Sequence, residues 1–132
     1  MPATIGSTVP EFTLLDQDGA SVSMSSLRGN WVVVYFYPKD DTPGCTAESC
    51  SFRDSHEAFT DAGARVIGIS SDSVASHRAF ATKHSLPFTL LADEGGVVRK
   101  QFGVGRTLGL LPGRVTYVID PSGIVRHEFS SQ

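Results

Sequence analysis

The chain has 132 residues, of which 40% are hydrophobic and 19% are charged, a composition typical of a soluble globular protein. Its length predicts one domain over residues 1–132. The formal net charge is -3 and the basic residues form no run, which gives no reason to expect nucleic acid or an anionic membrane as a partner. Residues 1–6 show no basic or apolar leader, and no apolar run approaches the ~20 residues that span a bilayer, so we expect a cytoplasmic protein.

The first half of the chain is predicted to contain extended segments followed by one long helix. Trp31 to Tyr37 is a continuous β-branched and aromatic run, typical of a strand buried on both faces of a parallel sheet. Pro38 ends this strand because proline has no N–H group to donate to a sheet. The elements expected here are two short extended pieces, this strand and a helix, at residues 12–15, 21–24, 31–37 and about 45–62.

The second half is predicted to alternate strands with helices and to close with a hairpin. The elements are a strand at 65–70, a helix capped by Asp72 or Ser73 and ending near His84, a strand at 88–92, a short helix at 97–102, and strands at 114–120 and 124–129. Residues 103–109 are expected to form a flexible loop. This order indicates an α/β fold with a mixed central sheet and helices on both faces. A thioredoxin-like arrangement is one such fold, which the pattern alone does not select.

The segment from Pro38 to Cys50 carries the chemistry. It places Cys45 in the first turn of a helix, directly after a loop that leaves the central strand. Ligands of open α/β sheets favour the crevice beyond the carboxyl ends of the strands. Free N–H groups and the helix dipole favour negative charge at the same place, and the thiolate is the reactive form of cysteine. Cys45 is therefore placed to act as a nucleophile.

Cys50 lies in the same predicted helix, and its spacing from Cys45 has a geometric consequence. Five helical residues give a rise of ~7.5 Å, with the two Cα atoms about 8.6 Å apart. A disulfide tolerates a Cα separation of at most ~7 Å. A bond between Cys45 and Cys50 therefore requires the first turns of the helix to unwind.

Several simpler interpretations compete on local grounds. The cysteines suit two buried structural thiols, whereas zinc is disfavoured because no second cysteine pair is nearby. Arg114 suits an ordinary cation at the start of a strand, and Thr42 suits a turn. The adjacent acids Asp40 and Asp41 are expected to be solvated, and the histidines are expected at the surface or on helix faces: His56, His77, His84 and His127.

The motif Pro38-x-x-x-Thr42-x-x-Cys45 resembles the active-site signature of the peroxiredoxins. The longer run Asp41-Thr42-Pro43-Gly44-Cys45-Thr46-x-Glu48-x-Cys50 is similar to the bacterioferritin comigratory protein, or peroxiredoxin Q, branch of that family. Further agreement lies at residues 83–88 and 110–120, and the similarity spans roughly residues 5–130.

The resemblance implies a thioredoxin-like fold and a thioredoxin-dependent peroxidase. Cys45 would be the peroxidatic cysteine, which attacks hydrogen peroxide or an organic hydroperoxide and becomes a sulfenic acid. Cys50 would be the resolving cysteine, which closes an intramolecular disulfide with Cys45. Thioredoxin or a similar dithiol protein would then reduce this bond by exchange. The resemblance implies no cofactor and no metal.

The same resemblance assigns roles around the two cysteines. Thr42 would offer its hydroxyl to the peroxide and the thiolate, and Pro38 would shield the site from water. Arg114 would stabilise the thiolate and the charge that develops on the leaving oxygen. Glu48 would orient this arginine.

Two points stay open at this level. Family members usually carry a helix after the last strand, and this chain stops at Gln132 without it, so either the sheet lacks a covering element on one face or the chain is truncated. A bared apolar strip could be covered by a partner subunit, and we expect a monomer or a weak homodimer. The alternative functions are a redox sensor and a general dithiol–disulfide oxidoreductase. The latter normally uses two intervening residues between its cysteines, whereas four separate Cys45 from Cys50.

Overall fold

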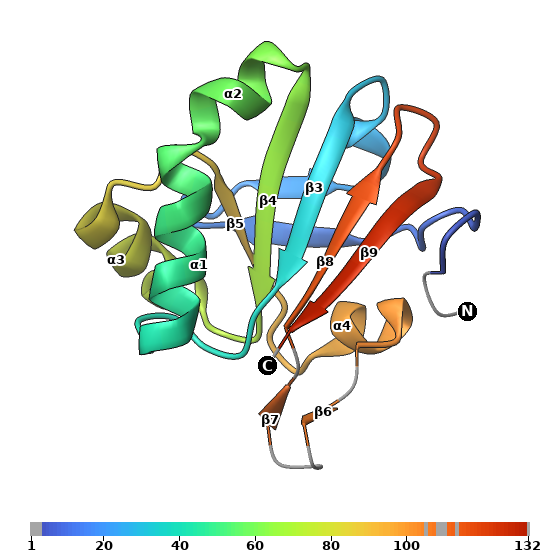
Figure 1. Ribbon diagram of the computed structural model, residues 1–132. Helices are drawn as coiled ribbons and strands as arrows, with labels where there is room; N and C mark the ends of the chain where they lie inside the picture. Colours follow the sequence, from blue (N-terminus) through green and yellow to red (C-terminus); the bar gives the residue numbers. More distant parts are fainter. Residues whose placement is uncertain (1–3, 105, 108–110, 113, 132) are drawn as a thin grey trace.

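The computed structural model describes residues 4–104, 106–107, 111–112 and 114–131 (Figure 1). Its strands are β1 (Thr13–Asp16), β2 (Ser21–Ser23), β3 (Trp31–Phe36), β4 (Ala64–Ser70), β5 (Thr89–Ala92), β6 (Arg106–Thr107), β7 (Leu111–Pro112), β8 (Arg114–Ile119) and β9 (Val125–Ser131). Its helices are α1 (Pro43–Asp54), α2 (His56–Asp61), α3 (Val74–His84) and α4 (Val97–Phe102), with a 3-10 turn at Ser25–Leu27. None of the described helices is long and apolar enough to cross a membrane.

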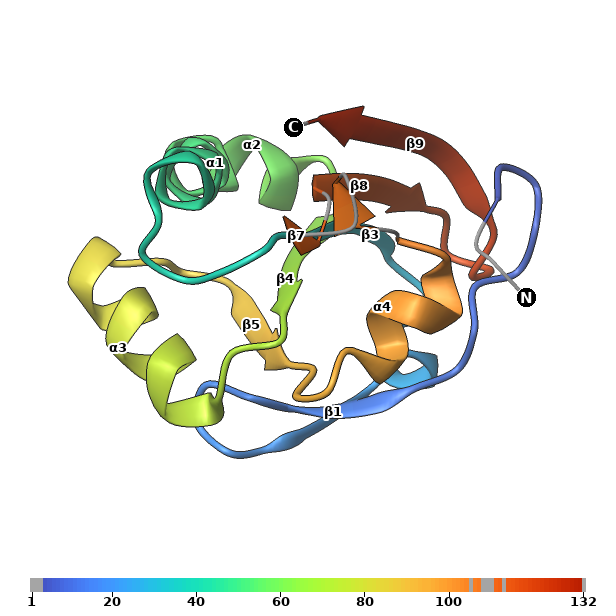
Figure 2. The ribbon, with the colours of Figure 1, turned by 90° about the horizontal axis from the view of Figure 1, so that it is seen from below.

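Seven strands form one twisted mixed sheet in the order β2-β1-β5-β4-β3-β8-β9. The central strands β3, β4 and β5 are parallel, whereas β1 and β8 pair with them in the antiparallel sense, and β9 pairs with β8. Figure 2 shows α1, α2 and α3 on one side of the central strands and α4 on the other. The prediction of a mixed sheet with helices on both faces is confirmed.

The sheet separates two hydrophobic cores, because successive side chains of a strand point to opposite faces. The cysteine-side core lies under α1, α2 and α3 and contains Val33, Tyr35, Tyr37, Cys45, Val66, Phe80, Ala81, Leu86, Phe88 and Leu90. The α4-side core contains Val9, Phe12, Met24, Leu27, Val32, Val34, Phe36, Ile67, Ile69, Leu91, Val98, Phe102, Val104, Tyr117, Ile119 and Val125. Strand β3 therefore contributes Val33 and Tyr35 to one core and Val32, Val34 and Phe36 to the other.

Most predicted elements occur where the pattern indicated. The short helix at 97–102 has the predicted bounds, and the strands differ by one or two residues at their ends. Of the two cap candidates of α3, Ser73 fills the role, since its hydroxyl accepts the N–H of Ser76 at 3.1 Å.

Two predictions need correction. The helix expected at about 45–62 begins earlier, at Pro43, and breaks at Ser55 into α1 and α2. Proline suits the first turn of a helix because its missing N–H needs no partner there, and Ser55 leaves helical geometry at φ -101° and ψ 5°. Within the loop expected at 103–109, residues 106–107 form β6, which pairs with β7; residues 105, 108 and 109 lie outside the described residues.

Candidate active site

Both cysteines lie in α1, which begins at the carboxyl edge of the parallel strands, where β3 leaves the sheet (Figure 1). Thr42 is the N-cap of α1 and Pro43 is its first residue, so Cys45 occupies the third helical position. The Cys45 side chain is 3% exposed and belongs to the cysteine-side core. A nearly buried thiol thus lies in the turn where helical N–H groups have no intrahelical partner.

Strand register brings Arg114 to this place from the far end of the chain. Val115 pairs with Phe36, the last residue of β3, so Arg114 lies next to the loop that leads into α1. The guanidinium packs against Gly44: a Cβ built on this glycine would lie 3.2 Å from the Arg114 Cζ and closer still to Nη1. Gly44 therefore provides the space that the arginine occupies, one residue before Cys45.

Thr42 has its hydroxyl orientation fixed by the loop. Its Oγ1 donates a hydrogen bond to the Lys39 carbonyl at 2.9 Å, and its own carbonyl accepts the N–H of Thr46 at 2.8 Å. Because the hydroxyl proton is used in this way, the oxygen retains lone pairs with which to accept a hydrogen bond. Pro38 is half-buried at the start of the same loop.

Glu48 lies one helical turn after Cys45 and is half-buried. Burial raises the pKa of its carboxyl group, and the positive charge of Arg114 partly offsets this effect. The Glu48 Oε1 atom is buried without a hydrogen-bond partner in the described part of the chain. The carboxylate and the guanidinium therefore interact at the same end of α1.

Cys50 is half-buried, and both cysteines are free thiols in one unbroken helix. The residue before it, Ser49, is fully buried and shares a 2.9 Å hydrogen bond with the Tyr35 hydroxyl. The ring of Phe52 stacks on Tyr35 with the centroids 4.6 Å apart. Strand β3 thus holds α1 near its middle, around the second cysteine.

A buried polar group beside this loop was not predicted from the sequence. Asp40, expected to be solvated, is 7% exposed, and His77, expected at the surface or on a helix face, lies on α3 and is fully buried. The His77 Nδ1 lies 2.7 Å from a carboxylate oxygen of Asp40. Of the other histidines, His56 and His84 are half-buried and His127 is exposed. The three- and four-residue spacing of His77 to Phe80 and Ala81 was the one available signal that it faces the core.

A family model described as the AhpC/TSA family matches residues 5–128. The chain belongs to this family. A chloroplastic peroxiredoxin Q from Sedum lineare is 59% identical over 130 residues, which cover 98% of this chain and 70% of that protein. The chain spans 59–70% of the length of this and other plant peroxiredoxin Q proteins that it matches.

Solved structures agree with this assignment. Peroxidoxin BcpB from Mycobacterium tuberculosis superposes with a TM-score of 0.90 at 41% identity, covering 98% of this chain and 86% of that one. The bacterioferritin comigratory protein of Xanthomonas campestris, described through its alkyl peroxide reduction activity, gives a TM-score of 0.85 at 34% identity, covering 90% and 80%. The predicted thioredoxin-like peroxiredoxin fold is confirmed.

The expectation of a cytoplasmic protein is wrong. Plant relatives at 56–59% identity are named chloroplastic peroxiredoxin Q, which points to the plastid. The expectation rested on the first six residues and on a default for cysteine-containing proteins. The residues that carry fold and chemistry do not encode a compartment.

Proposed function

We propose that this chain is a thiol peroxidase that reduces hydrogen peroxide and organic hydroperoxides, with Cys45 as the peroxidatic and Cys50 as the resolving cysteine. The observation that carries the proposal is the position of Cys45: a nearly buried thiol in the first turn of α1, with the Arg114 guanidinium packed against the preceding Gly44. The domain over residues 1–132 is sufficient for this chemistry, because it supplies both thiols and the groups around them.

In the first step, the Cys45 thiolate attacks one oxygen of the hydroperoxide. The O–O bond breaks, the sulfur keeps the attacked oxygen as a sulfenic acid, and the second oxygen takes up a proton from solvent and leaves as water or an alcohol. Arg114 and the N–H groups of the first helical turn stabilise the charge that develops on the leaving oxygen. The Thr42 oxygen accepts a hydrogen bond from the protonated oxygen of the peroxide, and Pro38 keeps bulk water from the thiolate.

In the second step, the Cys50 sulfur attacks the sulfenic acid, water leaves, and the intramolecular disulfide forms. An intact helix keeps these residues too far apart for a disulfide. The first turns of α1 therefore unwind before this step. A dithiol protein of the thioredoxin type then reduces the disulfide by exchange. We propose a monomer or a weak homodimer as the working species.

The experiment is intact mass measurement after one equivalent of hydrogen peroxide on the reduced protein, Cys45→Ser and Cys50→Ser. The native protein is expected to lose two hydrogens, Cys50→Ser to gain oxygen, and Cys45→Ser to remain unchanged. A Cys45→Ser variant that reacts as fast as the native protein, or a native protein inert for many seconds, would show that the peroxidase assignment is wrong.

Unwinding of α1 has its own test. Amide hydrogen exchange is expected to lose protection over residues 45–52 when the disulfide forms, because the helical hydrogen bonds there are broken. Unchanged protection would contradict the intramolecular disulfide and favour a bond between two molecules.

A further inference from the structure

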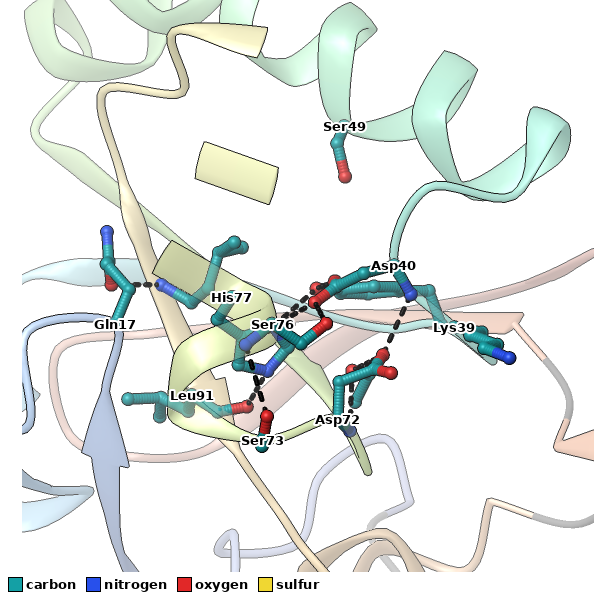
Figure 3. Close-up of polar contacts among 12 residues, drawn as sticks. Gln17, Lys39, Asp40, Ser49, Asp72, Ser73, Ser76, His77 and Leu91 are labelled. Atoms are coloured by element: carbon teal, nitrogen blue, oxygen red, sulfur yellow. Dashed lines mark hydrogen bonds and ion pairs between the residues drawn. The ribbon is translucent and has the colours of Figure 1, made fainter. Parts of the chain in front are cut away.

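His77 contacts two groups that only accept hydrogen bonds. Its Nδ1 lies 2.7 Å from the Asp40 Oδ2, and its Nε2 lies 2.9 Å from the carbonyl oxygen of Leu91 in β5 (Figure 3). A neutral imidazole has one N–H group, so it satisfies one of these contacts and places two lone pairs against each other at the other. The imidazolium, which has two N–H groups, satisfies both.

The surroundings of Asp40 favour the carboxylate as the partner of this imidazolium. Its Oδ1 accepts the Tyr37 hydroxyl at 2.6 Å, and its Oδ2 accepts the Ser76 hydroxyl at 2.9 Å as well as His77. Hydrogen bonds to the charged form stabilise that form. Burial and the neighbouring negative charge raise the pKa of Tyr37 well above its usual value, so this hydroxyl remains a donor.

A resident cation fits these atoms poorly. Asp40, Asp72 and His77 bring potential ligand atoms within 4.8 Å of one another. However, with Asp40 as a carboxylate, the 2.7 Å contact between its oxygen and the His77 Nδ1 requires a proton on that nitrogen, which then has no lone pair for a metal. The Asp72 Oδ2 already accepts the N–H of Asp40 at 2.8 Å and the Ser70 hydroxyl at 2.7 Å.

The loop between β3 and α1 is therefore held by α3 from two sides. Inside, His77 and Ser76 bind the side chain of Asp40. Outside, the Lys83 ammonium lies 2.8 Å from Asp41, which adopts a left-handed φ of 60°. A non-glycine residue stays in this conformation only when its surroundings fix it. The next residue is Thr42, whose hydroxyl donates to the Lys39 carbonyl.

We propose that the buried ion pair of protonated His77 and Asp40 positions the loop between β3 and α1, and through it the Thr42 hydroxyl, for reaction with peroxide. His77 is a positioning residue, since it acts through Asp40 and Lys39. This inference rests on the proposed peroxidase activity. The pair serves geometry more than stability, because a buried ion pair seldom stabilises a fold more than apolar residues of the same volume.

The test compares two substitutions of His77 in a Cys50→Ser background, where only the oxidation of Cys45 is measured. His77→Asn keeps an amide near the position of Nδ1, toward Asp40, whereas His77→Gln keeps one near Nε2, toward Leu91. We expect the second-order rate constant with hydrogen peroxide to fall about ten- to a hundredfold in His77→Gln and clearly less in His77→Asn. Equal losses, or no loss, would overturn the proposal.

Two controls separate positioning from a general loss of structure. Alkylation of Cys45 by iodoacetamide, which needs the thiolate but no oriented peroxide, is expected to keep its rate in both variants. Val98→Ala, in the α4-side core, destabilises the fold without touching the loop and is expected to leave the peroxide rate unchanged. Alkylation that falls by the same factor as peroxide reduction would contradict positioning.

A double-mutant cycle with Thr42→Val tests the route of the effect. If His77 acts through Thr42, His77→Gln lowers the rate much less in the Thr42→Val background than alone, because the effects of coupled residues do not add. Independent effects would show that His77 does not act through this hydroxyl.

A spectroscopic measurement on the native protein stands apart from activity. Nitrogen-15 NMR at pH 7 is expected to show both His77 ring nitrogens protonated, and a neutral tautomer would overturn the ion pair even if the variants fail to fold. A native protein that does not react with peroxide would instead refute the proposed function, and the NMR spectrum would still decide the protonation of His77.

Discussion

The two cores on either side of the sheet differ in what holds them together. In the α4-side core, Tyr117 is the one described residue with a hydroxyl group, and the rest of the cluster is aliphatic, aromatic or methionine. The cysteine-side core contains Tyr35, Tyr37 and Cys45. Beside it lie the buried side chains of Ser49 and His77, whose hydrogen bonds reach β3 and the loop before α1. The buried polar side chains near the α4-side core, Asp93 and Arg99, are hydrogen-bonded within residues 93–104 instead.

This difference separates two kinds of interaction. Apolar packing is non-directional and tolerates small adjustments. A buried hydroxyl or ring nitrogen needs a particular partner at a particular distance, or its desolvation is not offset. The α4-side core therefore supplies stability, whereas the cysteine-side core fixes the positions of groups around Cys45 and depends on their protonation.

Alkaline pH is expected to produce the largest effect, the loss of the folded state. Burial raises the pKa of Tyr35 and Tyr37 well above the usual value and that of Tyr117 to about 12. The unfolded chain loses these protons from about pH 10, whereas the folded chain retains them. The stability they contribute is full below pH 10 and is lost as pH rises through the folded values. Tyrosinate absorbance is expected to appear together with the loss of circular dichroism.

The same titration can also show that the two cores do not differ in this way. Tyrosinate that forms gradually near pH 10 in a protein that stays folded, with an amplitude that falls in Tyr37→Phe, would show that the cysteine-side core is open to water. Tyr37→Phe, which removes one donor to Asp40, is the variant in which the contribution of this hydroxyl is isolated.

Phe102→Ala tests the α4-side core. Phe102 is 1% exposed and contacts the rings of Phe12, Phe36 and Tyr117 at centroid distances of 5.0–5.9 Å. We expect a loss of about 3–5 kcal/mol in the free energy of unfolding, measured in urea. The oxidation rate of Cys45 in the folded fraction is expected to stay within about twofold. A tenfold slower rate would show that this core also positions the site.

Gly44→Ala is expected to have the opposite effect to Phe102→Ala: the rate with peroxide falls while the stability of the fold does not. The added methyl group would overlap the Arg114 guanidinium, so the arginine must move and the rate with peroxide falls by about tenfold. Stability is retained or rises, because alanine favours a helix over glycine by up to ~1 kcal/mol. Ala47→Gly is the matched control on the exposed side of α1, with lower stability and an unchanged rate. An unchanged rate in Gly44→Ala would rule out this role of Arg114.

Glu48→Gln is the smallest expected change. Burial raises the pKa of Glu48, so the folded chain binds this proton more tightly than the unfolded chain. Stability therefore falls as pH rises above about 4.3 and levels off above the folded value. Glutamine avoids this loss, and we expect the variant to be more stable by about 0.5 kcal/mol at pH 7 and no more stable at pH 3. Urea unfolding at both pH values measures it, and a less stable variant at pH 7 would contradict the sign.

Sequence patterns were sufficient for the elements whose signals are local. The helix at residues 97–102 lies between glycines, and two good N-cap residues, Asp72 and Ser73, precede α3, so both helices were predicted, although only the structure selects Ser73 as the cap. The break at Ser55 was missed because neither proline nor glycine marks it. Of the predicted site residues, Arg114 is brought to Gly44 by the register of β8 on β3, which no local pattern contains.

The burial of Asp40 and His77 could not be predicted from local sequence patterns. The two residues are 37 positions apart, and each is of a type that is mostly exposed or only partly buried in proteins. Their burial follows from the packing of α3 against the loop after β3. The family motif covers that loop but not α3, so it indicated the cysteine and threonine and left the histidine out.

The hydrogen bond between Ser49 and Tyr35 has a consequence for the reduction potential. Ser49 lies between the two cysteines, so in the proposed mechanism the unwinding of α1 as far as Cys50 breaks this 2.9 Å hydrogen bond in the oxidised form only. A lost buried hydrogen bond costs about 1–3 kcal/mol, which for a two-electron couple corresponds to about 20–60 mV. If the proposed disulfide forms, the hydrogen bond of Ser49 makes it easier to reduce, so we expect this serine to influence which dithiol proteins are able to reduce it.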